Sequence, residues 1–278
     1  MSTACSVLIP AHNEAGYIGP CLEALLASDP VDAAIEVIVM ANGCSDDTVA
    51  LAQAFEGRFD AKGWPLTVLD LPQGGKMGAL NAGDAAARHG ARIYVDADVA
   101  VSPPLMAQLA VVLDDDAPRY ASGGPVVRAA GSAFTRAYAR FWASLPFVTH
   151  GVPGFGVFAV NAAARARWGA FPDIISDDTF VRLSFKPQER HRVPATYEWP
   201  MIEGAGPLIR VRRRQDIGVA EVKSLFPALW DNHDPVPSDA PPFWRRALRD
   251  PLGFAAFAVV GVAVRLPHRK QERWARGR

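Results

Sequence analysis

The chain has 278 residues, half of them apolar, which is enough for a substantial buried core and argues against a disordered chain. Its 29 basic and 29 acidic residues cancel, so general nucleic-acid binding is not expected. The balance is uneven, because residues 241–278 carry a net charge of +7 and the preceding 240 residues are correspondingly acidic. A basic end on a neutral protein favours an acidic partner surface, and membrane lipid is the commonest one.

Three cysteines, Cys5, Cys21 and Cys44, lie far apart and form no CxxC pair. This spacing predicts reduced thiols rather than a disulfide framework or a zinc site. The first residues lack the basic region and apolar core of a secretory signal. We therefore expect a cytoplasmic protein, with peripheral attachment to the cytoplasmic face of a membrane as a further possibility.

Short apolar strands alternate with helical patterns through the first hundred residues. Strands are predicted at residues 5–10, 35–40, 65–71 and 92–95, and helices at residues 18–26, 48–55 and 77–89. This alternation predicts an α/β fold with a mostly parallel sheet covered by helices on both faces. Ligands of such sheets bind at the carboxyl ends of the strands.

The rhythm changes after residue 96. Helices are predicted at residues 103–113, along an aromatic stripe at residues 134–145, and from Ser176 onward. Four prolines within residues 235–242 predict a linker. We expect a catalytic domain over residues 1–234, with a nucleotide half at about 1–100 and an acceptor half at about 101–234, followed by a tail at residues 235–278.

Acidic and amide side chains gather where the strands are predicted to end. Asp96 and Asp98 follow one strand and, two residues apart, can face the same ligand. Such hard oxygen ligands suit Mg²⁺ or Mn²⁺ bound together with substrate phosphates. The alternative is a solvated turn, since the acidic run at residues 114–116 shows that such runs also occur at a helix end.

A second acidic pair, Asp177 and Asp178, follows Ser176 at a predicted helix start. A serine cap and acidic residues in the first turn are sufficiently explained by helix stability. The same placement also holds a carboxylate ready to accept a proton from a substrate hydroxyl.

Two basic features are candidate phosphate contacts. Lys76 lies in a glycine-rich loop before a helix, although the P-loop pattern is absent. The first strand is not followed by G-x-G-x-x-G, which removes the main support for a dinucleotide dehydrogenase. Arg213 belongs to a late cluster with Arg210, Arg212 and Arg214, which fits a diphosphate clamp or a solvated basic face.

Five motifs in one order give a more specific signal than any of them alone. They are VLIPAHNE at residues 7–14, ANGCSDDT at 41–48, GKMGALN at 75–81, YVDAD at 94–98 and SDD at 176–178. In this order they resemble glycosyltransferase family 2 over roughly residues 5–218. The resemblance implies a GT-A-type fold and inverting, metal-dependent transfer of a sugar from a nucleotide-diphosphate sugar, with a UDP-sugar favoured, to a sugar, glycan or lipid-linked acceptor hydroxyl. Glycan, exopolysaccharide or glycolipid synthesis is the implied setting.

The resemblance also implies roles for individual residues. The nucleotide pocket would include Pro10, Asn13, Glu14, Asn42 and Asp46, with Asp46 on the base or ribose. Lys76 and Arg213 would lie near the phosphates. Asp96 would face the ribose or metal, and Asp98 would ligate the metal. Asp178 would be the catalytic base, and Asp177 stands where glutamate is usual.

Two positions depart from the family pattern. Ala41 replaces an aspartate that often ends the second strand, which puts base recognition in doubt. The tryptophan of the late motif of processive synthases is missing, so transfer of a single sugar is expected.

Two other functions remain as alternatives. A sugar nucleotidyltransferase would show a glycine-rich basic loop after the first strand, where this chain has AHNE. A non-catalytic nucleotide-sugar binder or membrane scaffold would not need both Asp98 and Asp178.

The tail contains fourteen uncharged residues, 251–264, between Arg249 and a basic end. This is short for a hydrocarbon core of ~30 Å, which takes about twenty helical residues. It fits a segment at a membrane surface, with Trp244 and Trp274 at the interface, or else a helix packed on the catalytic domain.

Overall fold

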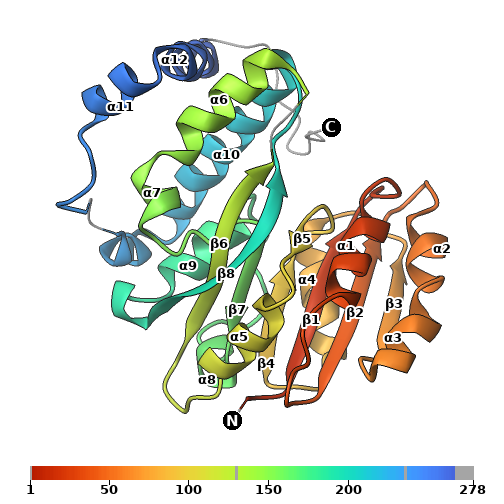
Figure 1. The fold of residues 1–278 in the computed structure, drawn as a ribbon. Coiled ribbons are helices and arrows are strands. Elements are labelled where there is room, and N and C mark those ends of the chain that lie inside the picture. Colours follow the sequence, from red (N-terminus) through yellow and green to blue (C-terminus); the bar gives the residue numbers. More distant parts are fainter. Residues whose placement is uncertain (1, 129–130, 235–236, 267–278) are drawn as a thin grey trace. The chain divides into compact units, whose positions relative to one another are not determined.

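The computed structural model describes residues 2–128, 131–234 and 237–266, which form two compact units (Figure 1). Unit 1 comprises Met1–Val126, Val152–Asp173 and Ser184–Trp199 and contains the sheet. Unit 2 comprises Val127–Gly151, Ile174–Leu183 and the chain from Pro200 onward, and its described residues are mainly helical. Residues 235 and 236 of the predicted linker, and Trp274, lie outside the described residues.

Within the described residues, eight strands form one sheet in the order β3-β2-β1-β4-β7-β6-β8-β5. β1 (Cys5–Ala11) pairs in parallel with β2 (Ile35–Asn42) and β4 (Ala91–Val95), and β2 pairs in parallel with β3 (Leu66–Leu71). These four strands confirm the predicted α/β fold. β7 (Val157–Val160) runs antiparallel to β4 and β6 (Tyr120–Arg128), and β5 (Ala100–Val101) runs antiparallel to β8 (Arg190–Pro200).

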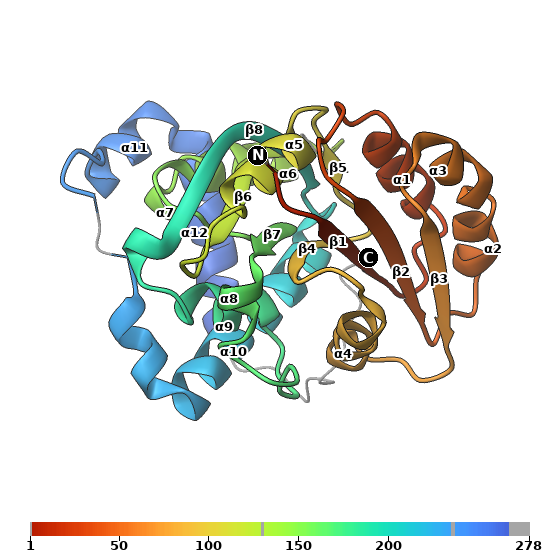
Figure 2. The ribbon, with the colours of Figure 1, turned by 90° about the horizontal axis from the view of Figure 1, so that it is seen from below.

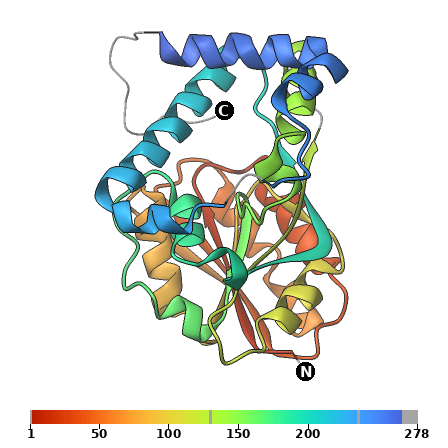
Figure 3. The same ribbon diagram turned by 90° about the vertical axis from the view of Figure 1, so that its left-hand side faces the viewer.

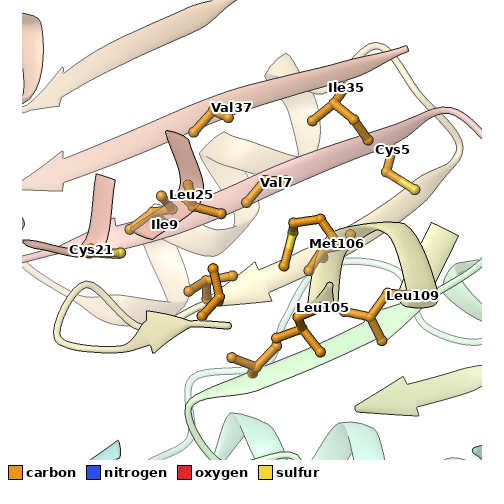
Figure 4. Close-up of a cluster of buried hydrophobic side chains, with 14 of the residues drawn as sticks. Cys5, Val7, Ile9, Cys21, Leu25, Ile35, Val37, Leu105, Met106 and Leu109 are labelled. Atoms are coloured by element: carbon orange, nitrogen blue, oxygen red, sulfur yellow. The ribbon is translucent and has the colours of Figure 1, made fainter. Parts of the chain in front are cut away.

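β1, β2 and β4 are buried on both faces, which explains their nearly continuous apolar sequences, whereas the edge strand β3 is partly exposed. α1 (Ile18–Leu26), α2 (Thr48–Gln53) and α3 (Glu56–Lys62) cover one face, and α4 (Lys76–Ala86) covers the other (Figure 2). Alternate residues of β1, among them Val7 and Ile9, enter a core that includes Leu25 and residues of α5 (Leu105–Val112) (Figure 4). On the α4 face Met40 packs so closely that a Cβ on Gly83 would lie 2.7 Å from its sulfur.

Two predicted helices differ from the observed ones. The helix predicted at residues 48–55 is α2, and a separate helix, α3, follows it. The helix predicted at residues 77–89 ends at Ala86, because Arg88 leaves the helical path and donates from its backbone N and Nε to Glu36, at 2.6 and 2.7 Å. α8 (Ala162–Arg165) completes the α-helices of unit 1 in the described residues.

In the described residues, the α-helices of unit 2 are α6 (Ala133–Ala143), α7 (Pro146–Thr149), α9 (Asp177–Leu183), α10 (Ala205–Leu225), α11 (Phe243–Arg249) and α12 (Pro251–Arg265). The predicted aromatic stripe lies on α6, where Phe141 contacts the rings of Phe254 and Phe257. α12, the long blue helix at the top of Figure 3, thus packs on α6 and also contacts α10. For residues 251–264 the expected packed helix is observed, and attachment to a membrane surface stays a prediction.

Candidate functional site

Loops that follow the carboxyl ends of β1 and β2 are joined to the loop before α4 by one buried side chain, Asn42. Its Nδ2 donates to the carbonyl of Ala11 at 2.8 Å, and its Oδ1 accepts from the backbone N of Gly75 at 3.0 Å. The backbone oxygen of Asn42 lies 2.5 Å from Nδ1 of His12. Asn42, predicted to bind the nucleotide, therefore uses its amide to hold three backbone segments together. Pro10 lies one residue before the end of β1, opposite Met40 of β2.

Gly43 allows two of these loops to meet. Its φ of 56° lies in the left-handed region, and an added Cβ would lie 2.7 Å from the backbone N of Gly74. A side chain at residue 43 would therefore force the loop before Lys76 outward.

Asn13 lies in the loop after β1 with a φ of 54°, which is unusual for a residue other than glycine. Its Oδ1 accepts from the backbone N of Ser45 at 2.7 Å and from Ser45 Oγ at 3.2 Å. Its Nδ2 is buried and has no hydrogen-bond partner among the described residues. A buried amide without a partner is costly, so this atom is suited to donate to a ligand.

Asp46 fixes the same loop from the other side. Its carboxylate accepts from the backbone N of Thr48 at 3.1 Å and from that of Ala15 at 3.2 Å, while Thr48 Oγ1 accepts from the backbone N of Glu14. Burial by itself raises the pKa of Asp46, but the hydrogen bonds from Thr48 and Ala15 outweigh it and lower the pKa. Asp46 is thus held as a carboxylate whose two oxygens shape the loop around Glu14.

Lys76 and Asp96 form an ion pair between the start of α4 and the end of β4. Lys76 Nζ donates to Asp96 Oδ1 at 2.9 Å, with a quarter of the lysine side chain and 35% of the aspartate side chain exposed. The backbone N of Asp96 donates to the carbonyl of Gly156 at 2.8 Å. The predicted phosphate contact and the predicted metal ligand are therefore neighbours.

Both predicted metal ligands lie near a buried thiol of α1. The pKa of Cys21 is strongly raised, first by burial and then by the negative charges of Asp98 and Asp96. The thiol therefore stays protonated at neutral pH.

The chemistry of the available ligand atoms indicates which metal could bind at Asp96 and Asp98. In the described residues no group of three or more His, Cys, Asp or Glu side chains is placed to hold an ion. Asp96 and Asp98 supply hard oxygens only, and Asp96 Oδ1 already accepts from Lys76. This set fits Mg²⁺ or Mn²⁺, which keep waters and take further ligands from substrate phosphates.

The second acidic pair begins α9, in unit 2. Asp177 is buried, and Asp178 is partly exposed and accepts from the backbone N of Thr179 at 2.6 Å. α10 holds the preceding segment, because Glu221 Oε2 accepts from the backbone N of Ile175 at 2.9 Å and a Cβ on Gly218 would lie 2.4 Å from Ser176 Oγ.

Sequence reasoning missed Gly218 and Glu221 as positioning residues for this pair. The available signal was a glycine inside a long helix, which often indicates close packing.

Arg213 binds the end of α12. Its Nε donates to the carbonyl of Val264 at 3.2 Å, and its Nη2 donates to those of Ala263 and Leu266. A guanidinium at a helix C-terminus satisfies carbonyls that lack partners within the helix. In this structure Arg213 therefore anchors α12, and its predicted phosphate contact stays a prediction.

A cavity of about 620 Å³ opens at the other edge of the parallel strands, near Ala4 and Gly90 at their amino ends. Its lining includes residues 114–116 and none of the predicted site residues. It is therefore separate from the loops that carry the candidate site.

Comparison with known proteins gives a family and a fold. Residues 6–164, more than half of the chain, match the model of Glycosyl transferase family 2. A Drosophila melanogaster protein described as dolichyl-phosphate beta-glucosyltransferase is 32% identical over 130 residues, which are 44% of this chain and 39% of that protein. The chain thus matches well under half of that relative's length.

Solved structures share the fold at lower identity. A mannosyltransferase from Pyrobaculum calidifontis, in complex with GDP-Man and Mn²⁺, has a TM-score of 0.58 and 22% identity, covering 96% of this chain and 77% of its own. Glucosyl-3-phosphoglycerate synthase from Mycobacterium tuberculosis, in complex with Mn²⁺, UDP and glucosyl-3-phosphoglycerate, has a TM-score of 0.54 and 20% identity, covering 80% and 79%.

Proposed function

The chain belongs to glycosyl transferase family 2, and from this premise we propose that it transfers one sugar from a nucleotide-diphosphate sugar to an acceptor hydroxyl with inversion. The observation that carries the proposal is the meeting of the loops after β1 and β2 with the loop before α4, together with the Lys76–Asp96 pair at the end of β4. In parallel sheets this edge is where nucleotides bind.

The donor would be held by residues of unit 1. Asn13 Nδ2, which is buried without a partner, is suited to donate to the nucleotide, and the loop of Glu14 and Asp46 supports Asn13. Lys76 is suited to bind a phosphate oxygen, because it stands at the first turn of α4, where the helix dipole also favours an anion.

Asp96 and Asp98 would hold Mg²⁺ or Mn²⁺, which neutralises charge on the departing nucleoside diphosphate when bound. The two structural neighbours named above contain Mn²⁺. The neighbours hold GDP-Man in one case and UDP in the other, so the donor base is open to test; we propose a UDP-sugar.

Asp178 would act as the general base. Its carboxylate takes the proton of the acceptor hydroxyl as that oxygen forms a bond to the anomeric carbon. The bond from the anomeric carbon to the phosphate oxygen breaks, and its electron pair leaves with the nucleoside diphosphate. A single displacement inverts the anomeric centre. Glu221 and Gly218 would position Asp178 through the segment before α9.

The acceptor and its setting are also proposals. The name of the Drosophila relative contains a lipid phosphate, which supports a lipid-linked acceptor. The positive charge of residues 241–278 supports peripheral attachment to an anionic membrane at its cytoplasmic face.

A thermal-shift screen tests the donor proposal. A ligand that binds the native state raises its apparent stability. We expect one sugar among the UDP, GDP and dTDP series to raise the melting temperature with Mn²⁺, and the same sugar with EDTA to raise it far less. No shift from any donor in the presence of Mn²⁺ would contradict the proposal.

A further inference from the structure

α12 has an apolar face packed within unit 2 and a second apolar face that is exposed. Gly253, Ala256 and Val260 are buried, and Phe257 stacks on Tyr138 of α6 at a centroid distance of 5.7 Å. At the C-terminal end of α12, Arg213 donates a hydrogen bond to the carbonyl of Val264. The helix is therefore held firmly along one side (Figures 1 and 3).

The other side of α12 exposes an apolar stripe formed by Leu252, Ala255, Val259 and Val262, and exposed Leu266 follows directly after the helix; we call these residues the α12 stripe. Leu252 is 74% exposed, Val259 is 55% exposed and Val262 is 59% exposed. Their spacing of three and four residues places them on one helix face. A helix that is apolar all round is normally buried on all sides, so this face indicates a further partner.

Exposed arginines flank the α12 stripe along the chain. Arg245 and Arg249 are exposed on α11, and Arg265 is exposed at the end of α12. The one acidic residue within residues 243–265 is Asp250, and both of its carboxylate oxygens accept from Arg140, at 2.8 and 2.7 Å. The exposed charges that flank the stripe in the chain are therefore positive, and they favour an anionic partner.

Anionic lipid fits both properties of the surface. The stripe contains no hydrogen-bonding side chain, and hydrocarbon requires none, while the flanking arginines match lipid phosphates. A second copy of the chain facing the stripe would bring the arginines of α11 together, which costs energy through like-charge repulsion. The charge thus favours a bilayer over self-association.

The length of α12 determines how it would lie. Fifteen helical residues extend about 22 Å, which is less than the ~30 Å hydrocarbon core. In the described part of the chain no helix is both long and apolar enough to span a membrane. Because one face of α12 is packed on α6, we expect the helix to lie parallel to a membrane surface and not to cross the hydrocarbon core.

We infer that the α12 stripe and the arginines around it form the surface that docks on an anionic phospholipid bilayer, with α12 parallel to the membrane. Exposed Trp244 and Leu248 of α11 extend the contact. This inference rests on the membrane attachment in the proposed function and names the surface responsible for it.

Sedimentation of the full chain with vesicles tests the inference. The vesicles are phosphatidylcholine alone or phosphatidylcholine mixed with phosphatidylglycerol. We expect binding to the mixed vesicles that weakens with salt. The double variant Val259→Glu/Val262→Glu should reduce binding at least about tenfold, because apolar contact is lost and negative charge is added.

Val111→Glu is the matched control, since Val111 is also a valine, 59% exposed, on α5. It should bind vesicles like the wild type. Arg245→Ala and Arg249→Ala should each weaken binding to the mixed vesicles by about fivefold. These two variants test the inference if the glutamate variant has a lowered melting temperature.

Equal vesicle binding by the wild type and the glutamate variant would overturn the inference. So would a wild-type dimer that the glutamate variant abolishes, without vesicle binding, because the stripe would then be a self-association surface. Release of nucleoside diphosphate from a donor sugar, measured without vesicles, should be unchanged in the glutamate variant. Vesicle binding by a chain that releases none would contradict the proposed transfer while supporting the docking surface.

Discussion

Lys76 Nζ lies 2.9 Å from Asp96 Oδ1, so a cation of the protein occupies one oxygen of a proposed metal ligand. Lysine and a divalent metal would compete for this carboxylate. The same lysine would attract the phosphates of a donor. One side chain thus has opposite effects on the two proposed ligands.

Lys76→Met should therefore change two affinities in opposite directions. Without nucleotide, Mn²⁺ should bind about tenfold more tightly, because a nearby positive charge is lost; nucleoside diphosphate should bind about tenfold more weakly. Titration calorimetry measures both. Lys62→Met is the charge-matched control, since Lys62 ends α3 before the amino end of β3. Weaker binding of both ligands would contradict competition at Asp96.

Asp178→Asn tests the proposed base. The variant keeps the size of the side chain but cannot accept the proton, so turnover should fall by about 10²–10⁴. Donor affinity should hardly change, because the base acts on the acceptor. Asp216→Asn, on the exposed side of α10, should leave turnover near the wild-type value. Near-normal turnover of Asp178→Asn would remove Asp178 from the role.

Gly218→Ala tests whether α10 positions the segment before α9. A Cβ would lie 2.4 Å from Ser176 Oγ and 2.9 Å from Ile175, so this segment must move. Turnover should fall about 10- to 100-fold with little change in donor affinity. Gly206→Ala is the control in the same helix, because its Cβ would meet only the guanidinium of Arg210, at 3.7 Å. Equal turnover in the two variants would show that the close packing at Gly218 is unimportant for catalysis.

The strands of unit 1 could be predicted because their buried faces leave long apolar runs. Residues 5–10 were predicted as a strand, and Cys5–Ala11 is observed. The meeting of Asn13, Asn42 and Lys76 at one edge followed from parallel pairing. The hydrogen bonds of the Asn42 amide to the protein's own backbone could not be predicted, because they depend on where the loop containing Gly75 lies in the folded chain. The antiparallel direction of β7 could not be predicted either, because four apolar residues fit a parallel and an antiparallel strand equally well.

The ionised carboxylate of Glu36 makes the stability of the folded protein depend on pH. It is buried and accepts from Ser6 Oγ and from the backbone N and Nε of Arg88. Burial by itself raises the pKa of Glu36, but these hydrogen bonds outweigh it and lower the pKa below its ordinary 4.5. A lowered pKa in the folded state stabilises the protein above the unfolded value, and this stability is lost as the pH falls through the folded value.

Glu36→Gln should therefore lower the free energy of unfolding at pH 7 by about 2 kcal/mol, the typical value for hydrogen bonds to a charged group. The difference should shrink as the pH falls below 4.5. Urea unfolding across this range measures it, with Glu23→Gln, at an exposed ion pair with Arg58, as the control. A difference that stays constant down to acid pH would contradict the ionised form of Glu36.

The most direct test of the account is calorimetric binding of UDP, GDP and dTDP to the wild type and to Asp98→Ala, each with Mn²⁺ and with EDTA. We expect one nucleotide to bind the wild type with Mn²⁺, and EDTA or Asp98→Ala to weaken that binding by at least about tenfold. Addition of Mn²⁺ after EDTA should restore binding in the wild type only. Nucleotide binding that is indifferent to both Mn²⁺ and Asp98, or no binding of any of the three, would contradict a metal-dependent donor site at Asp96 and Asp98.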